Sequence, residues 1–209
     1  MSNLFKMFIC IFMLFMSHYV NAGTSISNLP ENFFIIDNLL IGKATFDDVK
    51  TKFGTANTFR RSSQEESDVL ICYSSSIKQH KAYLIFESGA MGGFNRITGF
   101  RLTTDSYINK NCSNTEIDLL SLRTASGVGL KQTKKDFLRR HKVNFKLQKN
   151  SKLIYQNESK RDATEEEKQE LQKNWPDEKQ YYFDVLVNIE AKFRNNLLID
   201  YKVSRVESF

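Results

Sequence analysis

The spacing of apolar residues predicts a short helix in the first half of the chain. Phe46, Val49 and Phe53 recur at intervals of three and four residues, which places their side chains on one face of a helix. Thr45 precedes this run as an N-cap residue, and Gly54 follows it as a natural C-terminal stop. We therefore expect an amphipathic helix of about two and a half turns between Thr45 and Gly54.

Three apolar runs after this helix predict strands. They lie in Asp68–Ser74, Lys81–Ser88 and Arg96–Thr104, and each is bounded by polar or glycine-rich sequence. The short connections between them favour antiparallel neighbours. The first half of the chain thus reads as one helix followed by a three-stranded meander.

The second half contains the clearest strand pattern of the chain. In Tyr181–Arg194 the odd positions are apolar and the even positions are mostly polar, which indicates one buried and one solvent-facing side. Leu197–Val206 follows after a tight turn at Asn195-Asn196. Lys152–Gln156 is a shorter strand candidate upstream.

The order of elements is repeated along the chain. Val128–Leu138 echoes Ile41–Val49, with Gly129 and Thr133 in the places of a glycine and an N-cap threonine. We predict an α+β fold of two tandem modules, each a short helix followed by a three-stranded antiparallel meander. The first module takes residues 23–115 and the second takes residues 116–209. Whether the two share one continuous sheet stays open.

The second module carries an insertion that the first lacks. Thr164 and Glu167 form a capping-box pattern, so a charged helix is expected near residues 164–174, stopped by Trp175-Pro176. An insertion on one side of a repeated scaffold is a natural place for a specific function. The alternative is a solvated helix that covers a sheet edge.

The first 22 residues have the features of a signal peptide. Lys6 precedes an apolar run of about ten residues, Met7–Met16, and the segment ends Val20-Asn21-Ala22. The run is too short to span a bilayer, which takes about 20 residues. We expect cleavage before Gly23, a periplasmic or secreted location, and no transmembrane segment after cleavage. A membrane anchor is the alternative.

Composition and cysteine content agree with an exported globular protein. The chain is 41% hydrophobic and 26% charged, and its formal net charge of +6 permits attraction to anionic surfaces without requiring it. Two cysteines, Cys72 and Cys112, remain after cleavage of the leader, and in an oxidising compartment they are expected to pair. The alternative is a buried free thiol at Cys72.

The repeated pattern resembles a known family. A Gly-x-x-Thr-x-x-x-Val helix closed by Phe-Gly, with a meander after it, resembles the tandem helix-plus-sheet modules of the β-lactamase inhibitor protein family. It is also similar to the small outer-membrane-assembly lipoproteins, which carry one such module. The resemblance implies a scaffold whose concave sheet face binds another protein, and it names no target. The residues that carry it are Gly42, Thr45, Val49, Phe53, Gly54, Gly129, Thr133 and Phe137.

No catalytic or metal-binding pattern is present. His80 and His141 lie far apart in the sequence, and no Gly-x-Ser-x-Gly motif occurs. We therefore predict no catalytic residues, no metal and no cofactor, and a non-enzymatic function. A small hydrolase that the sequence hides is an alternative.

The expected function is protein binding, as an inhibitor-like or envelope-associated factor. We predict that Tyr182 and Arg194, on the polar side of their strand, form a binding surface with Trp175 at its rim, because such side chains dominate interface energies. The partner is expected to be a protein of unknown identity and not a nucleic acid.

A basic stretch at residues 131–152 carries the alternative function, binding to a polyanion or a membrane surface. It can also be a solvated helix face that is neutralised by the acidic residues Glu165–Glu167. Its leading residues are Lys131, Lys134, Lys135 and Arg139.

Overall fold

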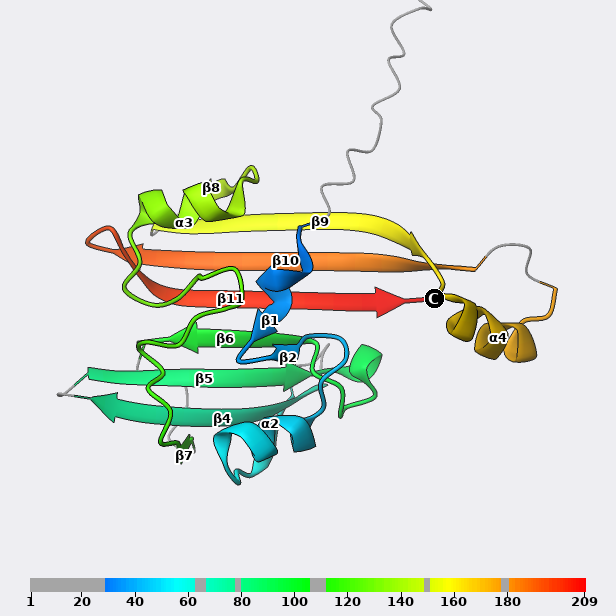
Figure 1. The fold of residues 1–209 in the computed structure, drawn as a ribbon, viewed down its shortest axis with the longest axis horizontal. Coiled ribbons are helices and arrows are strands. Elements are labelled where there is room, and N and C mark those ends of the chain that lie inside the picture. Colours follow the sequence, from blue (N-terminus) through cyan, green and yellow to red (C-terminus); the bar gives the residue numbers. More distant parts are fainter. Residues whose placement is uncertain (1–28, 63–66, 78–79, 106–111, 149–150, 178–180) are drawn as a thin grey trace, which may run out of the picture.

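A computed structural model of the chain describes residues 29–62, 67–77, 80–105, 112–148, 151–177 and 181–209 (Figure 1). The predicted leader at residues 1–22 and the expected mature start at Gly23 lie outside the described residues.

Nine strands of the described chain form one sheet, and its strands lie along the long axis of the molecule (Figure 1). Eight of them follow the order β3-β4-β5-β6-β11-β10-β9-β8, and neighbours along this path are antiparallel. The ninth strand, β7, pairs with β4 in parallel. The bounds are β3 Thr58–Ser62, β4 Ser67–Ile77, β5 His80–Ser88, β6 Gly99–Thr103, β7 Ser113–Asn114, β8 Lys146–Gln148, β9 Lys152–Asp162, β10 Tyr182–Arg194 and β11 Leu197–Ser208.

Helices and a small hairpin accompany this sheet. The α-helices are α2 Phe46–Phe53, α3 Lys134–His141 and α4 Glu165–Asn174. The 3-10 helices are η2 Glu31–Phe34 and η3 Ala90–Gly92, and the hairpin pairs β1 Ile35–Ile36 with β2 Leu39–Leu40.

The predicted α+β fold of two tandem modules is wrong. The protein is mostly β, and β6 of the first half pairs with β11 of the second, so that Phe100 lies opposite Val203. The number of strands also differs from the prediction, because α2 is followed by five strands, β3 to β7, and α3 by four, β8 to β11, with α4 between β9 and β10. Two of the additional strands are β3 and β8, which follow α2 and α3 directly. Neither of these strands carries apolar alternation: β8 has three residues, all exposed, and β3 is largely polar. The expected boundary at residue 115 falls after β7, and the sheet continues across it.

The helices α2 and α3 join the sheet through equivalent backbone contacts. The N–H of Phe46 donates to Asn95, and the N–H of Lys134 donates to Asn196, so each helix begins beside a turn that leads into a strand. The sequence pattern matched Gly129 to Gly42, but these hydrogen bonds make Lys131 the residue equivalent to Gly42. Lys131, with a φ of 64°, donates to Leu198 in the way that Gly42 donates to a residue ahead of β6.

The predicted helix α2 is confirmed together with its caps. The Thr45 hydroxyl accepts a hydrogen bond from the Asp48 N–H at 3.3 Å, and the Asp48 carboxylate accepts one from the Thr45 N–H at 2.8 Å. Gly54 ends the helix with a φ of 96°, a conformation that favours glycine. Val49 and Phe53 are buried against the sheet.

The main core lies between the sheet and the α2 and α3 helices. Phe53 of α2 packs on Tyr73 and Phe86, with ring centroids 5.5 Å apart in both pairs. Phe137 of α3 packs on Phe193 at 5.4 Å and lies close to Tyr201. Aromatic side chains from both halves therefore fill one continuous core above one sheet.

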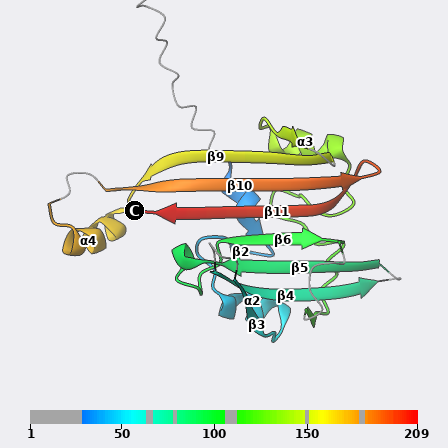
Figure 2. The same ribbon diagram turned by 180° about the vertical axis from the view of Figure 1, so that it is seen from behind.

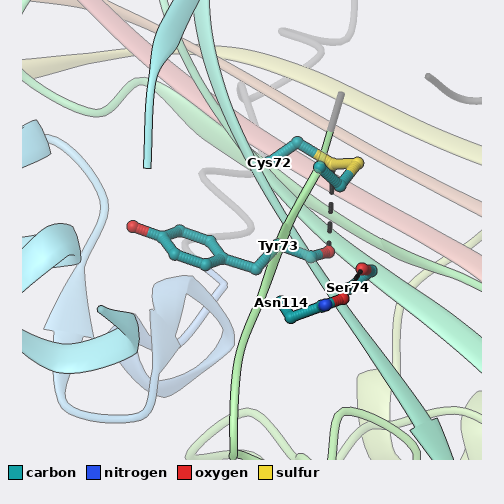
Figure 3. The surroundings of a disulfide bond; sticks show 5 residues. Cys72, Tyr73, Ser74 and Asn114 are labelled. Carbon is teal, nitrogen blue, oxygen red and sulfur yellow. Dashed lines mark hydrogen bonds between the residues drawn. A yellow bond between two sulfur atoms is a disulfide. The ribbon is translucent and has the colours of Figure 1, made fainter. Parts of the chain in front are cut away.

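The predicted disulfide between Cys72 and Cys112 is confirmed, and it spans 40 residues. Cys72 and Tyr73 are neighbours on β4, so their side chains point to opposite faces of the sheet (Figure 3). The Tyr73 hydroxyl donates to the Gly54 carbonyl at 2.8 Å on the core side. On the other side, the disulfide belongs to a small second cluster made of Leu70, Cys72, Tyr83 and Ile85.

Candidate functional site: a hollow at the far end of β9, β10 and β11

The long strands β9, β10 and β11 extend past the rest of the sheet, and α4 stands at this end (Figures 1 and 2). A hollow of about 670 Å³ opens here, and we call it the distal hollow. A smaller hollow of about 270 Å³ shares Glu31, Arg161 and Arg205 with it. The residues that line the distal hollow include Glu31, Ile41, Arg161, Glu167, Glu170, Phe183, Arg205 and Glu207.

Strand alternation places the floor of the hollow on the same face as the core. Phe183 lies opposite Arg161, and Val185 lies opposite Glu207, so all four side chains share one face of the sheet. Val185 is buried, whereas Phe183 is half-buried. The floor therefore continues the core face of β10 into a region where polar and charged side chains replace the apolar ones.

Arg161 is the central side chain of this floor. Its Nη1 and Nη2 atoms donate to the two Glu167 carboxylate oxygens, both at 2.8 Å, and its Nε donates to Glu207 at 2.8 Å. The guanidinium carbon also lies 4.4 Å from the centroid of the Phe183 ring. A guanidinium group that binds one carboxylate through two nitrogens is held in a fixed orientation. Arg161 thus joins β9 to α4, β10 and β11.

The charges of this network stabilise one another. The hydrogen bonds from Arg161 lower the pKa of Glu167 to about 2, with further help from the Thr164 N–H. The same hydrogen bonds raise the pKa of Arg161 above its ordinary value. Both groups are therefore charged at every physiological pH.

The position of α4 follows from the same glutamate. The predicted capping box is confirmed, since the Thr164 hydroxyl accepts from the Glu167 N–H and the Glu167 carboxylate accepts from the Thr164 N–H at 2.8 Å. Leu171 is the buried residue of the helix. One side chain, Glu167, thus caps α4 and fixes it to β9 through Arg161.

Aromatic side chains form a rim beside the hollow. The Phe209 ring lies 5.1 Å from Trp175 and 5.9 Å from both Tyr181 and Phe183. The Tyr181 hydroxyl donates to the Trp175 carbonyl at 2.7 Å. Trp175 remains 48% exposed and Phe209 46% exposed. We call Trp175, Tyr181, Phe183 and Phe209 the aromatic rim.

The residues that we predicted for a binding surface are not brought together. Trp175 belongs to the aromatic rim, but Tyr182 lies on the opposite face of β10, where the Lys160 ammonium sits 3.8 Å from its ring centroid. Arg194 is exposed at the other end of β10, roughly 40 Å from Tyr182 at the usual rise of a strand.

The basic stretch lies at the other end of the sheet from α4 (Figures 1 and 2). Lys131 precedes α3, and the helix itself carries Lys134, Lys135 and Arg139, the last of which pairs with Asp136 at 2.7 Å. Two acidic residues of α4 have other partners. Glu165 pairs with Lys168 and Glu167 pairs with Arg161. The interpretation in which α4 neutralises the basic stretch is therefore wrong.

The two histidines of the described chain do not meet. His80 begins β5, whereas His141 is buried in the aromatic core. The pKa of His141 is lowered to about 4 because burial disfavours the charged imidazole. Within the described residues, no group of three or more His, Cys, Asp and Glu side chains is placed to hold a metal ion.

Sequence reasoning missed Arg161, Phe183 and Glu207 as members of one site. The expected strand stopped at Gln156, because the next six residues, Asn157–Asp162, are all polar and show no alternation. They nevertheless continue β9, since they pair with β10 over their whole length. The capping-box pattern at Glu167 was the one local signal in this region, and it indicated only where a helix begins.

Comparison with known proteins gives no further identification. No protein-family model, curated protein or solved structure matches this chain. Within the described residues, no helix is long and apolar enough to cross a membrane. The disulfide is compatible with an oxidising, extracytoplasmic location.

Proposed function

We propose that this chain is an exported, non-catalytic protein-binding protein, inhibitor-like or envelope-associated, that holds its partner at the aromatic rim of the distal hollow. The observation that carries the proposal is the exposure of Trp175 and Phe209 beside a concave surface. Aromatic side chains next to a hollow supply much contact area at a low cost in conformational entropy.

The rigidity of the platform supports this function. Arg161 and Glu167 hold α4 against the strands, and Tyr181 fixes the backbone at Trp175 through its hydroxyl group. A surface that is ordered before binding loses less freedom when it binds. We therefore expect a partner to dock on this end of the sheet without rearrangement of the floor.

The acidic side chains of α4 beside the aromatic rim favour a partner with a basic surface. The first turn of α4 carries Glu165 and Glu166, both exposed, and Glu170 lines the hollow. A protein surface that presents an apolar side chain flanked by basic residues fits this arrangement.

The test is quantitative capture from the exported proteins of the source cells. The bait is the mature chain, and the comparison is with a Trp175→Ala/Phe209→Ala double variant. Met91→Ala serves as the matched control, because Met91 is a 62% exposed apolar residue on η3, outside the rim. We expect a partner that the wild type and the control retain and the double variant loses.

Two results would count against the proposal. One is the absence of any saturable partner. The other is a partner that the double variant retains while its thermal unfolding matches that of the wild type. Tyr182→Ala and Arg194→Ala, tested singly, determine whether the other predicted residues belong to the surface.

A second candidate function is binding to an anionic surface through Lys131, Lys134, Lys135 and Arg139. The placement of α4 at the opposite end of the sheet favours it, because these cations are then not neutralised by the acidic helix. The measurement is co-sedimentation with phosphatidylglycerol vesicles over a range of salt concentrations. Steep loss of binding with salt, and loss in Lys134→Ala/Lys135→Ala, would favour this function over binding at the aromatic rim.

A further inference from the structure

β9 has a free edge along most of its length. β8 pairs with β9 only at Lys152–Ile154, whereas β10 pairs with β9 from Lys152 to Asp162. From Gln156 to Asp162, no strand of the described chain lies on the side of β9 away from β10 (Figure 1). Such an edge presents unpaired N–H and C=O groups that can bind another extended chain.

We propose that β9 pairs in antiparallel fashion with β9 of a second copy of this chain, around a twofold axis that passes between the two Ser159 residues. The sheet then continues from one molecule into the other, and each subunit uses the same patch, as a twofold dimer requires.

Charge complementarity selects this register. In an antiparallel pair of strands, two residues directly opposite each other point to the same face of the sheet. A twofold axis perpendicular to the sheet must therefore place one residue directly opposite its own copy in the partner. An axis at Ser159 places Glu158 opposite the partner's Lys160, and Lys160 opposite the partner's Glu158. An axis at Glu158 or at Lys160 would instead place like charges directly opposite each other, which is destabilising.

The two side chains are available for this contact. Glu158 and Lys160 are both exposed on the same face of β9. Glu158 makes no ion pair with any described residue of its own chain. Lys160 lies over the Tyr182 ring and reaches Asp184 only at 3.9 Å, and the side chains of Lys160 and Asp184 are both largely exposed. The second copy therefore supplies Glu158 with the cation that its own chain does not.

The ends of the free edge fit the same register. Asp162 falls opposite Gln156 of the partner subunit, and beyond that point the partner's own β8 covers its β9. The chain leaves the sheet there, because Thr164 is the N-cap of α4. β9 thus ends where the partner's β8 begins, and the two elements do not compete for the same edge.

The test is the oligomeric state of the mature chain, measured by sedimentation equilibrium, with charge-reversed variants. Glu158→Lys or Lys160→Glu alone makes two facing pairs repulsive, so each is expected to raise the dimer dissociation constant by roughly tenfold or more. The double swap Glu158→Lys/Lys160→Glu restores opposite charges and is expected to restore the dimer. Lys173→Glu, on an exposed position of α4, controls for the change in net charge that Lys160→Glu makes.

Hydrogen exchange locates the interface independently. In the dimer, those backbone amides of residues 156–162 that point away from β10 are expected to exchange more slowly as the protein concentration rises. A chain that stays monomeric at its solubility limit would overturn the proposal, and so would a dimer whose β9 amides exchange at an unchanged rate. Slow exchange that does not depend on concentration and disappears on removal of residues 23–28 would also overturn it, because the chain would then cover its own edge.

Discussion

Lowering the pH is expected to destabilise the protein through His141. This side chain is 2% exposed and lies among aromatic rings. Its Nδ1 donates to the Phe137 carbonyl at 2.9 Å, and its Nε2 accepts from the Tyr201 hydroxyl at 3.2 Å, which is the pattern of a neutral imidazole. The rings that surround it belong to Phe33, Phe137, Phe145 and Tyr201.

The size of the effect follows from the difference in pKa between the two states. Burial lowers the pKa of His141 from 6.5 to about 4 in the folded protein. Because the unfolded chain takes up a proton at His141 more readily than the folded protein, acid favours unfolding. The resulting contribution to stability is complete above pH 6.5 and is lost as the pH falls toward 4. The full difference corresponds to about 3 kcal/mol, and most of it is already lost at pH 4.5.

Urea unfolding at a series of pH values between 7.5 and 4.5 measures this loss. Glu167 contributes little in that window, because its pKa of about 2 places its own effect between pH 4.5 and 2. His141→Gln can form similar hydrogen bonds but does not titrate, so its free energy of unfolding should change much less over the window. Equal slopes for this variant and the wild type, or a flat wild-type profile, would refute the reasoning.

Three further outcomes are expected. Phe53→Ala should lower the free energy of unfolding by about 3–5 kcal/mol in urea titrations, because it empties a buried aromatic site, and a loss under about 1 kcal/mol would contradict that packing. Mass measurement without reductant should find no free thiol at Cys72 or Cys112, and replacing both by alanine should cost about 2–4 kcal/mol of stability. Arg161→Ala leaves Glu167 without its main partner, so amides of α4 should exchange faster than in the wild type, while those of α2 stay unchanged.

The sequence predicted the elements whose signals are local. Thr45 and Gly54 mark the ends of α2, the alternation in β10 is visible over its whole length, and the Thr164 capping box is read from four residues. The disulfide also followed from simple counting, since two cysteines remain after residue 22. In each case the residues that determine the feature are either neighbours or too few to pair in another way.

The parts that sequence reasoning missed depend on contacts between distant segments. Nothing in the sequence of β6 indicates that β11 is its neighbour. Each of the two strands would bury the same apolar face if it belonged to a separate module. In the sequence His141 stands between Arg140 and Lys142, yet the helical turn places it beside Phe137, inside the core. Arg161 falls in a run of polar residues after the expected strand, and its two glutamate partners come from other elements, α4 and β11.

The central place of β11 has a consequence for how the chain reaches its native state. This strand lies between β10 and β6 although it is the last strand along the chain, and its contacts with β6 join residues about 100 positions apart. During synthesis, β6 is made long before its partner, so its edge stays open until the last segment has emerged. Closing so long a loop is also slow. We therefore expect the N-terminal half to gain no lasting structure on its own, and a chain stopped before β11 to aggregate.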